Sequence, residues 1–200
     1  MANIGGKIET DEEGRECMVI PVQKPRPSDL ELSWKPGPSA ESRYSPEEMA
    51  RITATLGKDM SKAIGAFAPG WAVASCGDEM DPGLREELRG KPNVLVTHPL
   101  NEEMGCVISR TVELPRGKRS TLALVVGHDA RGDWDLIVRV NGRQVLKKTV
   151  GPDTATLGWM EVDVDLSRLA GKSAKIELVN QPTGWRFEAA HWAKISLQSN

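Results

Sequence analysis

Cysteine, phenylalanine, tyrosine and long apolar runs are all scarce in this chain of 200 residues. Its three cysteines have no CxxC spacing, which argues against a disulfide framework and against a zinc knuckle. No apolar run approaches the roughly 20 residues that span a bilayer, and the first residues lack the apolar stretch of a secretory signal. Neither sign of charge is in excess, since Lys+Arg 26 and Asp+Glu 28 give a formal net charge of −2. We therefore expect neither nucleic acid nor a membrane surface as a partner.

Motifs for metal, nucleophilic and phosphate chemistry are also missing. The three histidines, His98, His128 and His191, lie far apart and form no HxH or HExxH pair, so no metal centre is predicted. There is no GxSxG segment and no Gly-rich phosphate loop. Cys76 lies in "ASCGDE" without a neighbouring catalytic motif, and it could pair with Cys106 if their strands lie side by side. A disulfide and separate buried thiols both stay open for these two residues.

Tryptophan and proline divide the chain into unequal parts. Five of the six tryptophans follow residue 70, whereas residues 1–44 are polar and rich in proline. We expect residues 1–44 to form an extended arm. Residues 45–67 are expected to form one helix packed on the domain that follows, and residues 68–200 to form that domain.

The predicted helix has a clear start and a clear apolar stripe. Ser45 is a candidate N-cap, Pro46 occupies the first helical position and Glu48 completes a capping box. Apolar residues then recur at helical spacing, at Met49, Ile52, Leu56, Met60 and Ile64. The pattern predicts an amphipathic helix over residues 46–65.

From Trp71 onward the hydrophobic period changes to two. Short β-rich segments such as "STLALVVGHD", "WDLIVRVN" and "GWMEVDVDL" are separated by Gly, Pro, Asn or Asp turns. Asn141-Gly142 is a strong signal for a type I′ hairpin turn. About eight or nine strands with no helix between them predict an all-β fold, an antiparallel β-sandwich, with the single helix at its N-terminal side.

The alternation also assigns faces. Met160, Val162, Val164 and Leu166 point one way and Glu161, Asp163 and Asp165 the other. In the last strand the predicted inner phase comprises Trp185, Phe187, Ala189, His191, Ala193, Ile195 and Leu197. The predicted outer phase comprises Arg186, Glu188, Trp192 and Lys194. Trp192 is therefore expected as a large aromatic side chain on the polar face.

The stretch "GHDARGDWDLIVRVNGRQVL…GWMEVDVDLSRLAGKSAKIELVNQPTGWRFEAAHWAKISL" resembles galactose-binding-like jelly-roll modules, the β-sandwich type of many carbohydrate-binding modules. It is particularly similar to versions that occur as accessory domains of planctomycete-type secreted proteins. The resemblance covers roughly residues 68–200. It implies a jelly-roll fold, a glycan ligand, and an extracellular or periplasmic rather than cytoplasmic location for a chain whose signal is not present here. Other domains of a parent protein are an implied partner.

The first candidate site is the hairpin tip, formed by His128, Asp129, Arg131, Asp133 and Trp134. A sugar site needs an apolar plate against the ring and a few fixed polar groups for the hydroxyls, and this cluster could supply both. In the alternative, the two aspartates cap the turn while the tryptophan packs inside. The tip's carboxylates and loop carbonyls could also hold a structural calcium ion, because calcium prefers hard oxygen ligands. No other cofactor is expected.

The second candidate site is an outer face formed by Arg139, Asn141, Arg186, Glu188 and Trp192. It requires the strand at residues 134–141 to neighbour the last strand, which would make an aromatic groove suited to a glycan. In the alternative, this is a solvated face whose tryptophan is covered by the N-terminal helix.

The third candidate is catalytic. Glu161-x-Asp163-x-Asp165 partly resembles the E-x-D-x-x-E strand of jelly-roll glycoside hydrolases, but the second Glu of that pattern is missing. A solvated acidic strand face explains the run without chemistry.

The sequence therefore favours a non-catalytic module that binds a polysaccharide or glycoconjugate and is accessory to a larger secreted protein. A protein-interaction or spacer sandwich with buried tryptophans is the alternative, and a glycan-active hydrolase is the third hypothesis.

Overall fold

The computed structural model describes residues 7–10, 16–19, 59–184 and 186–200. The chain divides into two units, Met1–Arg43 and Tyr44–Asn200. In the first unit, β1 (Lys7–Thr10) pairs with β2 (Glu16–Val19) in an antiparallel hairpin that the sequence did not predict. The second unit contains the sandwich.

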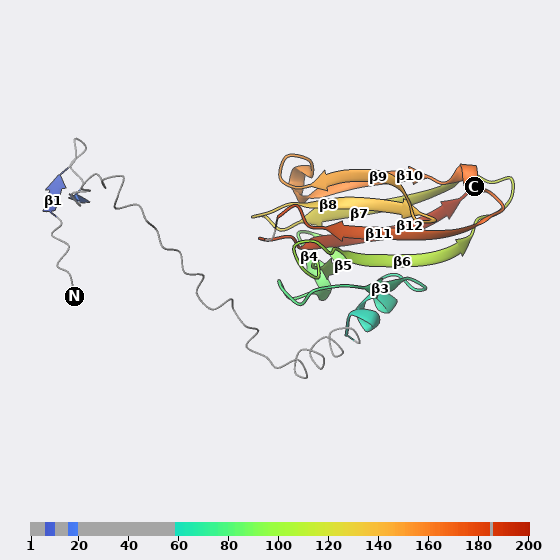
Figure 1. Cartoon of the computed structure of the whole chain (residues 1–200), viewed down its shortest axis with the longest axis horizontal. Coiled ribbons are helices and arrows are strands. Elements are labelled where there is room, and N and C mark those ends of the chain that lie inside the picture. The colour runs from blue at the N-terminus through green and yellow to red at the C-terminus, as the bar shows by residue number, and fades with distance from the viewer. Residues whose placement is uncertain (1–6, 11–15, 20–58, 185) are drawn as a thin grey trace, which may run out of the picture. The chain divides into compact units, whose positions relative to one another are not determined.

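Two antiparallel five-stranded sheets form the sandwich, which confirms the predicted all-β jelly-roll class (Figure 1). The first sheet has the order β10-β7-β12-β5-β4 and the second the order β3-β6-β11-β8-β9. The strands of the first sheet are β4 (Gly83–Leu88), β5 (Lys91–Thr97), β7 (Ser120–His128), β10 (Trp159–Asp165) and β12 (Ala190–Ser199). Those of the second are β3 (Ala72–Ala74), β6 (Cys106–Glu113), β8 (Trp134–Val140), β9 (Arg143–Val150) and β11 (Ser173–Gln181). Two short 3-10 turns, η2 (Thr156–Gly158) and η3 (Ser167–Leu169), flank β10.

Residues 59–67 are helical, so the end of the predicted helix is confirmed, while its first part and cap at 45–58 lie outside the described residues. Met60 and Ile64 are buried in the same core cluster as the sandwich, as their spacing predicted. No helix in the described part of the chain is long and apolar enough to cross a membrane.

Local sequence signals set two of the connections. Asn141 and Gly142 both adopt positive φ, 51° and 77°, as a type I′ turn requires. The side-chain oxygen of Asn141 accepts a hydrogen bond from the Lys175 backbone N–H at 2.8 Å, which ties this turn to β11. Cys76 and Cys106 form a disulfide with a Cα–Cα distance of 4.3 Å, so of the two readings left open the paired one holds.

The core between the sheets contains two tryptophans whose rings contact each other at a tilt of 51°. Trp134 and Trp192 are both 0% exposed, and their ring centroids lie 5.2 Å apart. The Trp134 ring nitrogen donates to the Gly127 carbonyl at 2.9 Å, and the Trp192 ring nitrogen donates to the Thr97 hydroxyl at 3.0 Å. Both indole N–H groups are therefore satisfied inside the core, as buried tryptophans need.

The predicted phase of the last strand is wrong at Trp192 and His191 because a β-bulge interrupts β12. Trp192 pairs with Val126 of β7 and Lys194 pairs with Val125, so Ala193 is an extra residue on β12. Before the bulge, Trp192 points into the core and His191 outward; after it, Lys194 points outward as predicted. One inserted residue therefore exchanges the faces that simple alternation assigned.

Candidate functional site

At the hairpin tip, the charged groups are engaged with each other. The Arg131 side chain donates to the two carboxylate oxygens of Asp129 at 2.8 and 3.2 Å, and the Arg131 backbone N–H donates to the same carboxylate at 3.0 Å. The hydrogen bond from Arg131 lowers the pKa of Asp129 below its ordinary value. The Arg131 guanidinium lies 4.0 Å from the ring centroid of Phe187. Asp129 therefore caps the turn, as the structural alternative proposed.

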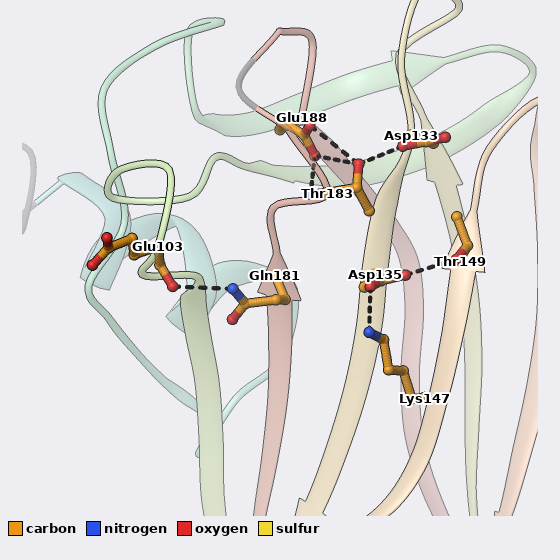
Figure 2. A network of polar contacts seen from close by, with 8 residues as sticks. All are labelled: Glu103, Asp133, Asp135, Lys147, Thr149, Gln181, Thr183 and Glu188. Atoms are coloured by element: carbon orange, nitrogen blue, oxygen red, sulfur yellow. Dashed lines mark hydrogen bonds and ion pairs between the residues drawn. The ribbon is translucent and has the colours of Figure 1, made fainter.

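The other residues of the tip are also hydrogen-bonded within the protein or buried. His128 is 4% exposed, and its Nδ1 lies 2.6 Å from the Asp129 carbonyl. Asp133 accepts a hydrogen bond from the Thr183 hydroxyl at 2.5 Å, a contact drawn in Figure 2. The prediction that Trp134 forms an apolar plate for a sugar ring is wrong, because its ring is buried in the core. Within the described residues, no group of three or more His, Cys, Asp or Glu side chains is arranged to hold a metal ion.

The second candidate site does not assemble, because its residues lie on different sheets. The strand with Arg139 and Asn141, β8, pairs with β11 and β9, whereas β12 pairs with β5 and β7. Trp192 is fully buried, and this excludes it as an exposed platform. Glu188 is 2% exposed and accepts backbone N–H bonds from Thr183 and Gly184 at 3.1 and 2.8 Å. Arg186 is exposed in the β11–β12 loop, apart from Arg139.

The acidic row of the third candidate forms one wall of a groove on the outer face of the first sheet. Glu161 and Asp163 of β10 lie directly opposite Val125 and Ala123 of β7, and Lys194 of β12 lies on the other side of Val125. A hollow of ≈ 220 Å³ runs between these strands. Its lining consists of Ala123, Leu124, Val125, Glu161, Asp163, Lys194 and Gln198. Small side chains on central β7 and long polar side chains on both neighbours produce the groove.

The charged groups of the groove are not committed to each other. Among the described residues, Glu161, Asp163 and Lys194 form no ion pair within 4.0 Å, and all three are exposed. Asp165 lies two residues further along β10. Hydrogen bonds from Ser167, first from its side chain and then from its backbone N–H at 2.8 Å, lower the pKa of Asp165. The free carboxylates and the free ammonium group thus offer acceptors and donors to a ligand.

Trp159 continues the same outward row of β10 and is half-buried. It pairs with Gly127, where an added Cβ would lie 2.9 Å from the indole ring, so the ring sits over the glycine. Its ring nitrogen donates to the Arg89 carbonyl at 3.2 Å, and its centroid is 6.4 Å from that of His191. Trp159 was not among the site residues predicted from the sequence, although this tryptophan shares the phase of Glu161 and lies opposite a glycine.

His191 lies beside Trp159 on this outer face but is only 6% exposed. Burial, followed by the nearby Arg89 charge, lowers the pKa of His191 to about 4. Its Nδ1 is buried and has no hydrogen-bond partner among the described residues. The imidazole is therefore neutral at neutral pH and supports the tryptophan as an apolar neighbour.

No protein-family model and no curated protein matches the chain. Solved structures with a similar chain course include a family 35 carbohydrate-binding module from Clostridium thermocellum, with 15% identity, a TM-score of 0.43, and coverage of 65% of this chain and 92% of that one. A family 61 carbohydrate-binding module in complex with β-1,4-galactotriose gives 16% identity and a TM-score of 0.47, and the match covers 67% of this chain and 90% of that one. A xylan-binding domain from Paenibacillus barcinonensis gives 14% identity and a TM-score of 0.45, and the match covers 66% of this chain and 86% of that one.

Proposed function

We propose that this sandwich is a non-catalytic module that binds a polysaccharide or other glycan along the groove over β7. The observation that carries the proposal is the set of uncommitted groups around a shallow floor: Glu161 and Asp163 on one wall, Lys194 and Gln198 on the other. Sugar hydroxyls both donate and accept hydrogen bonds, so mixed walls of this kind suit them. The half-exposed Trp159 next to the row supplies an apolar surface for a ring face.

The size of the row suits a chain rather than a single sugar. From Trp159 to Asp163 the strand extends about 13 Å at roughly 3.3 Å per residue. The hollow lies over β7 and is bounded on both sides by side chains from the neighbouring strands β10 and β12. A short linear stretch of a glycan could therefore lie parallel to β7.

The arrangement argues against glycoside hydrolysis. That reaction uses two carboxyl groups on opposite sides of the scissile bond. In this groove both carboxylates of the lining come from β10, and the facing wall carries an amine and an amide. Glu161 and Asp163 are thus placed to bind hydroxyls, without an acid across the groove.

The disulfide supports the location that the sequence resemblance implies. Disulfides form and persist mainly in oxidising compartments. Cys76 joins Cys106 at the start of β6, a sequence separation of 30 residues. The disulfide therefore supports our proposal that the module acts outside the cytoplasm, where the sequence resemblance implies an accessory domain of a secreted protein.

The test is affinity gel electrophoresis of the whole chain against soluble plant, algal and bacterial polysaccharides. We expect at least one glycan to retard the protein, and Trp159→Ala or the double change Glu161→Gln with Asp163→Asn to abolish the retardation. Trp159→Phe keeps a ring and should retain part of it. Glu113→Gln is the matched control, because Glu113 is an exposed carboxylate on β6 of the other sheet. Retardation that survives both groove variants, or no retardation by any glycan, would contradict the proposal.

Protein interaction is the second candidate function, and Leu157 favours it. This leucine is 98% exposed in η2 and has a positive φ of 64°, an uncommon conformation for a residue with a side chain. Residues held in uncommon backbone conformations cluster at functional contact sites, and this makes Leu157 a candidate contact residue. If glycans fail to bind, Leu157→Asp and capture of protein partners become the informative experiment.

A further inference from the structure

The outer face of the second sheet has a hollow of its own, separate from the groove over β7. It measures ≈ 370 Å³ and lies where β6, β8 and β11 meet the loop before β6. Its lining includes Val107, Val179, Arg139, Gln181, Met104 and Glu103. This volume falls within the range of small-molecule sites.

Two acidic side chains on the strands next to this hollow, Asp135 and Glu177, are paired with lysines, whereas the Arg139 side chain is not paired. Asp135 of β8 accepts from the Lys147 ammonium at 2.8 Å and from the Thr149 hydroxyl at 2.7 Å, as Figure 2 shows. Glu177 lies directly opposite Arg139 in the strand register, but its carboxylate is 2.7 Å from the Lys175 ammonium. The Arg139 side chain has no hydrogen bond or ion pair with any described residue. A half-buried guanidinium is thus left with unsatisfied donors that face the hollow.

The rest of the hollow combines apolar surface with one fixed amide. Val179 is 2% exposed although it lies on the outer face of the sheet, and with Val107 it contributes apolar lining. Gln181 donates from Nε2 to the Glu103 carbonyl at 3.0 Å, which orients the amide and leaves its oxygen as an acceptor. Figure 2 shows the Glu103 carboxylate directed away from Gln181. Met104, 49% exposed, completes an adaptable apolar wall.

We propose that this hollow binds a small organic carboxylate of about sugar size. Its carboxylate would accept paired N–H bonds from the Arg139 guanidinium, whose planar fork matches a carboxylate. Its apolar side would contact Val107, Val179 and Met104, and a hydroxyl would donate to the Gln181 amide oxygen. Arg139 is the one cationic side chain among the described residues of this lining, so the hollow suits a singly charged group better than a phosphate dianion. The proposal goes beyond glycan binding over β7, because it concerns the opposite sheet.

The test is isothermal titration calorimetry of the whole chain with glucuronate, glucose, acetate and inorganic phosphate as probes. We expect glucuronate to bind at least tenfold more tightly than glucose, acetate or phosphate. Arg139→Gln should weaken glucuronate binding at least tenfold, and Arg139→Lys should weaken it less. Arg143→Gln is the matched control, since Arg143 is an exposed arginine on β9 outside this hollow.

Several outcomes would overturn this assignment: no glucuronate binding, equal binding of glucose, acetate or phosphate, or unchanged binding in a folded Arg139→Gln variant. Circular dichroism of each variant separates loss of binding from loss of the fold. The Trp159→Ala variant should keep full affinity for glucuronate. Loss of glycan retardation and loss of carboxylate binding are therefore separate results, and either proposal can fail alone.

Discussion

Two tryptophans of the first sheet, Trp192 and Trp159, lie on opposite faces and have opposite roles. Trp192 is 0% exposed, packs against the tilted ring of Trp134, and donates to the Thr97 hydroxyl. Trp159 is half-buried over Gly127, next to a groove lined by uncommitted charges. The comparison shows that the strand register decides whether an aromatic residue of this sheet lies in the core or on the outer face, where the proposed ligand would contact it.

The polar groups differ in the same way between the two faces. On the inner face, the Asn180 amide nitrogen donates to the Thr97 carbonyl and the Glu188 carbonyl, both at 3.2 Å. On the outer face, Glu161, Asp163 and Lys194 have no ion pair among the described residues. Buried polar groups are costly unless they are hydrogen-bonded, whereas exposed ones can wait for a ligand.

The largest expected effect separates the two tryptophans by stability. Trp192→Ala should lower the free energy of unfolding by about 3–5 kcal/mol, because it removes a fully buried ring and leaves a cavity. Trp159→Ala should lower it by about 1 kcal/mol, since part of that ring already contacts water. Urea unfolding of both variants at neutral pH measures the difference. Equal losses in the two variants would mean that Trp159 is a core residue, and the comparison would fail.

The sequence predicts which residues of β10 point inward and which point outward, but it does not predict the inward position of Trp192. Alternation along β10 correctly places Val162 and Val164 inside, 3% and 8% exposed, and Glu161 and Asp163 outside. The Asn-Gly turn is equally well predicted, because positive φ at both positions demands those residue types. Hydrophobic alternation and turn residues are local signals, and alternation identifies the two faces of any strand without a bulge.

The bulge at Ala193 has no comparable local signal. Alanine neither requires nor forbids a bulge, so the reversed phase of Trp192 follows only from the pairing of β12 with β7 and β5. The separation of Arg139 from β12 also depends on strand order, which local patterns do not encode. Likewise, β4 (Gly83–Leu88) has the sequence GLREEL, whose polarity hides an edge strand. The prediction of the site therefore failed at those residues whose positions depend on pairing between strands that are distant in the sequence.

The second prediction concerns His191, which is on the outer face and yet buried. Its pKa is lowered from 6.5 to about 4 by burial, and the groups that act on it are Arg89, Asp129, His128 and Arg85. Below pH 6.5 the unfolded chain binds a proton that the folded imidazole rejects, so stability should fall as the pH drops from 6.5 to about 4. The total loss should be on the order of 3 kcal/mol.

Urea unfolding from pH 7 to pH 4 measures this loss, with His191→Gln as the comparison variant. The variant should lose about 3 kcal/mol less than the wild type over that range. The Asp129 contribution would be lost only below its ordinary value of 3.8, because its pKa is lowered, and so it lies outside this window. If the wild type and His191→Gln lose stability equally between pH 7 and pH 4, the His191 imidazole is hydrated and is not the buried neighbour of Trp159 that the structure indicates.

The smallest expected effects compare carboxylates that are paired with carboxylates that are free. Asp135, 8% exposed, holds both Lys147 and Thr149, so Asp135→Asn should cost about 1 kcal/mol of stability. Glu161→Gln and Asp163→Asn remove no ion pair or hydrogen bond of the described residues, and each should change stability by less than about 0.5 kcal/mol. Urea midpoints at neutral pH, measured beside glycan retardation, test both statements together. If the two groove variants lose retardation at unchanged stability, their carboxylates serve the ligand alone. If they unfold as easily as Asp135→Asn, the groove carboxylates stabilise the fold. The contrast between carboxylates that are paired within the protein and carboxylates that are free for a ligand would then fail.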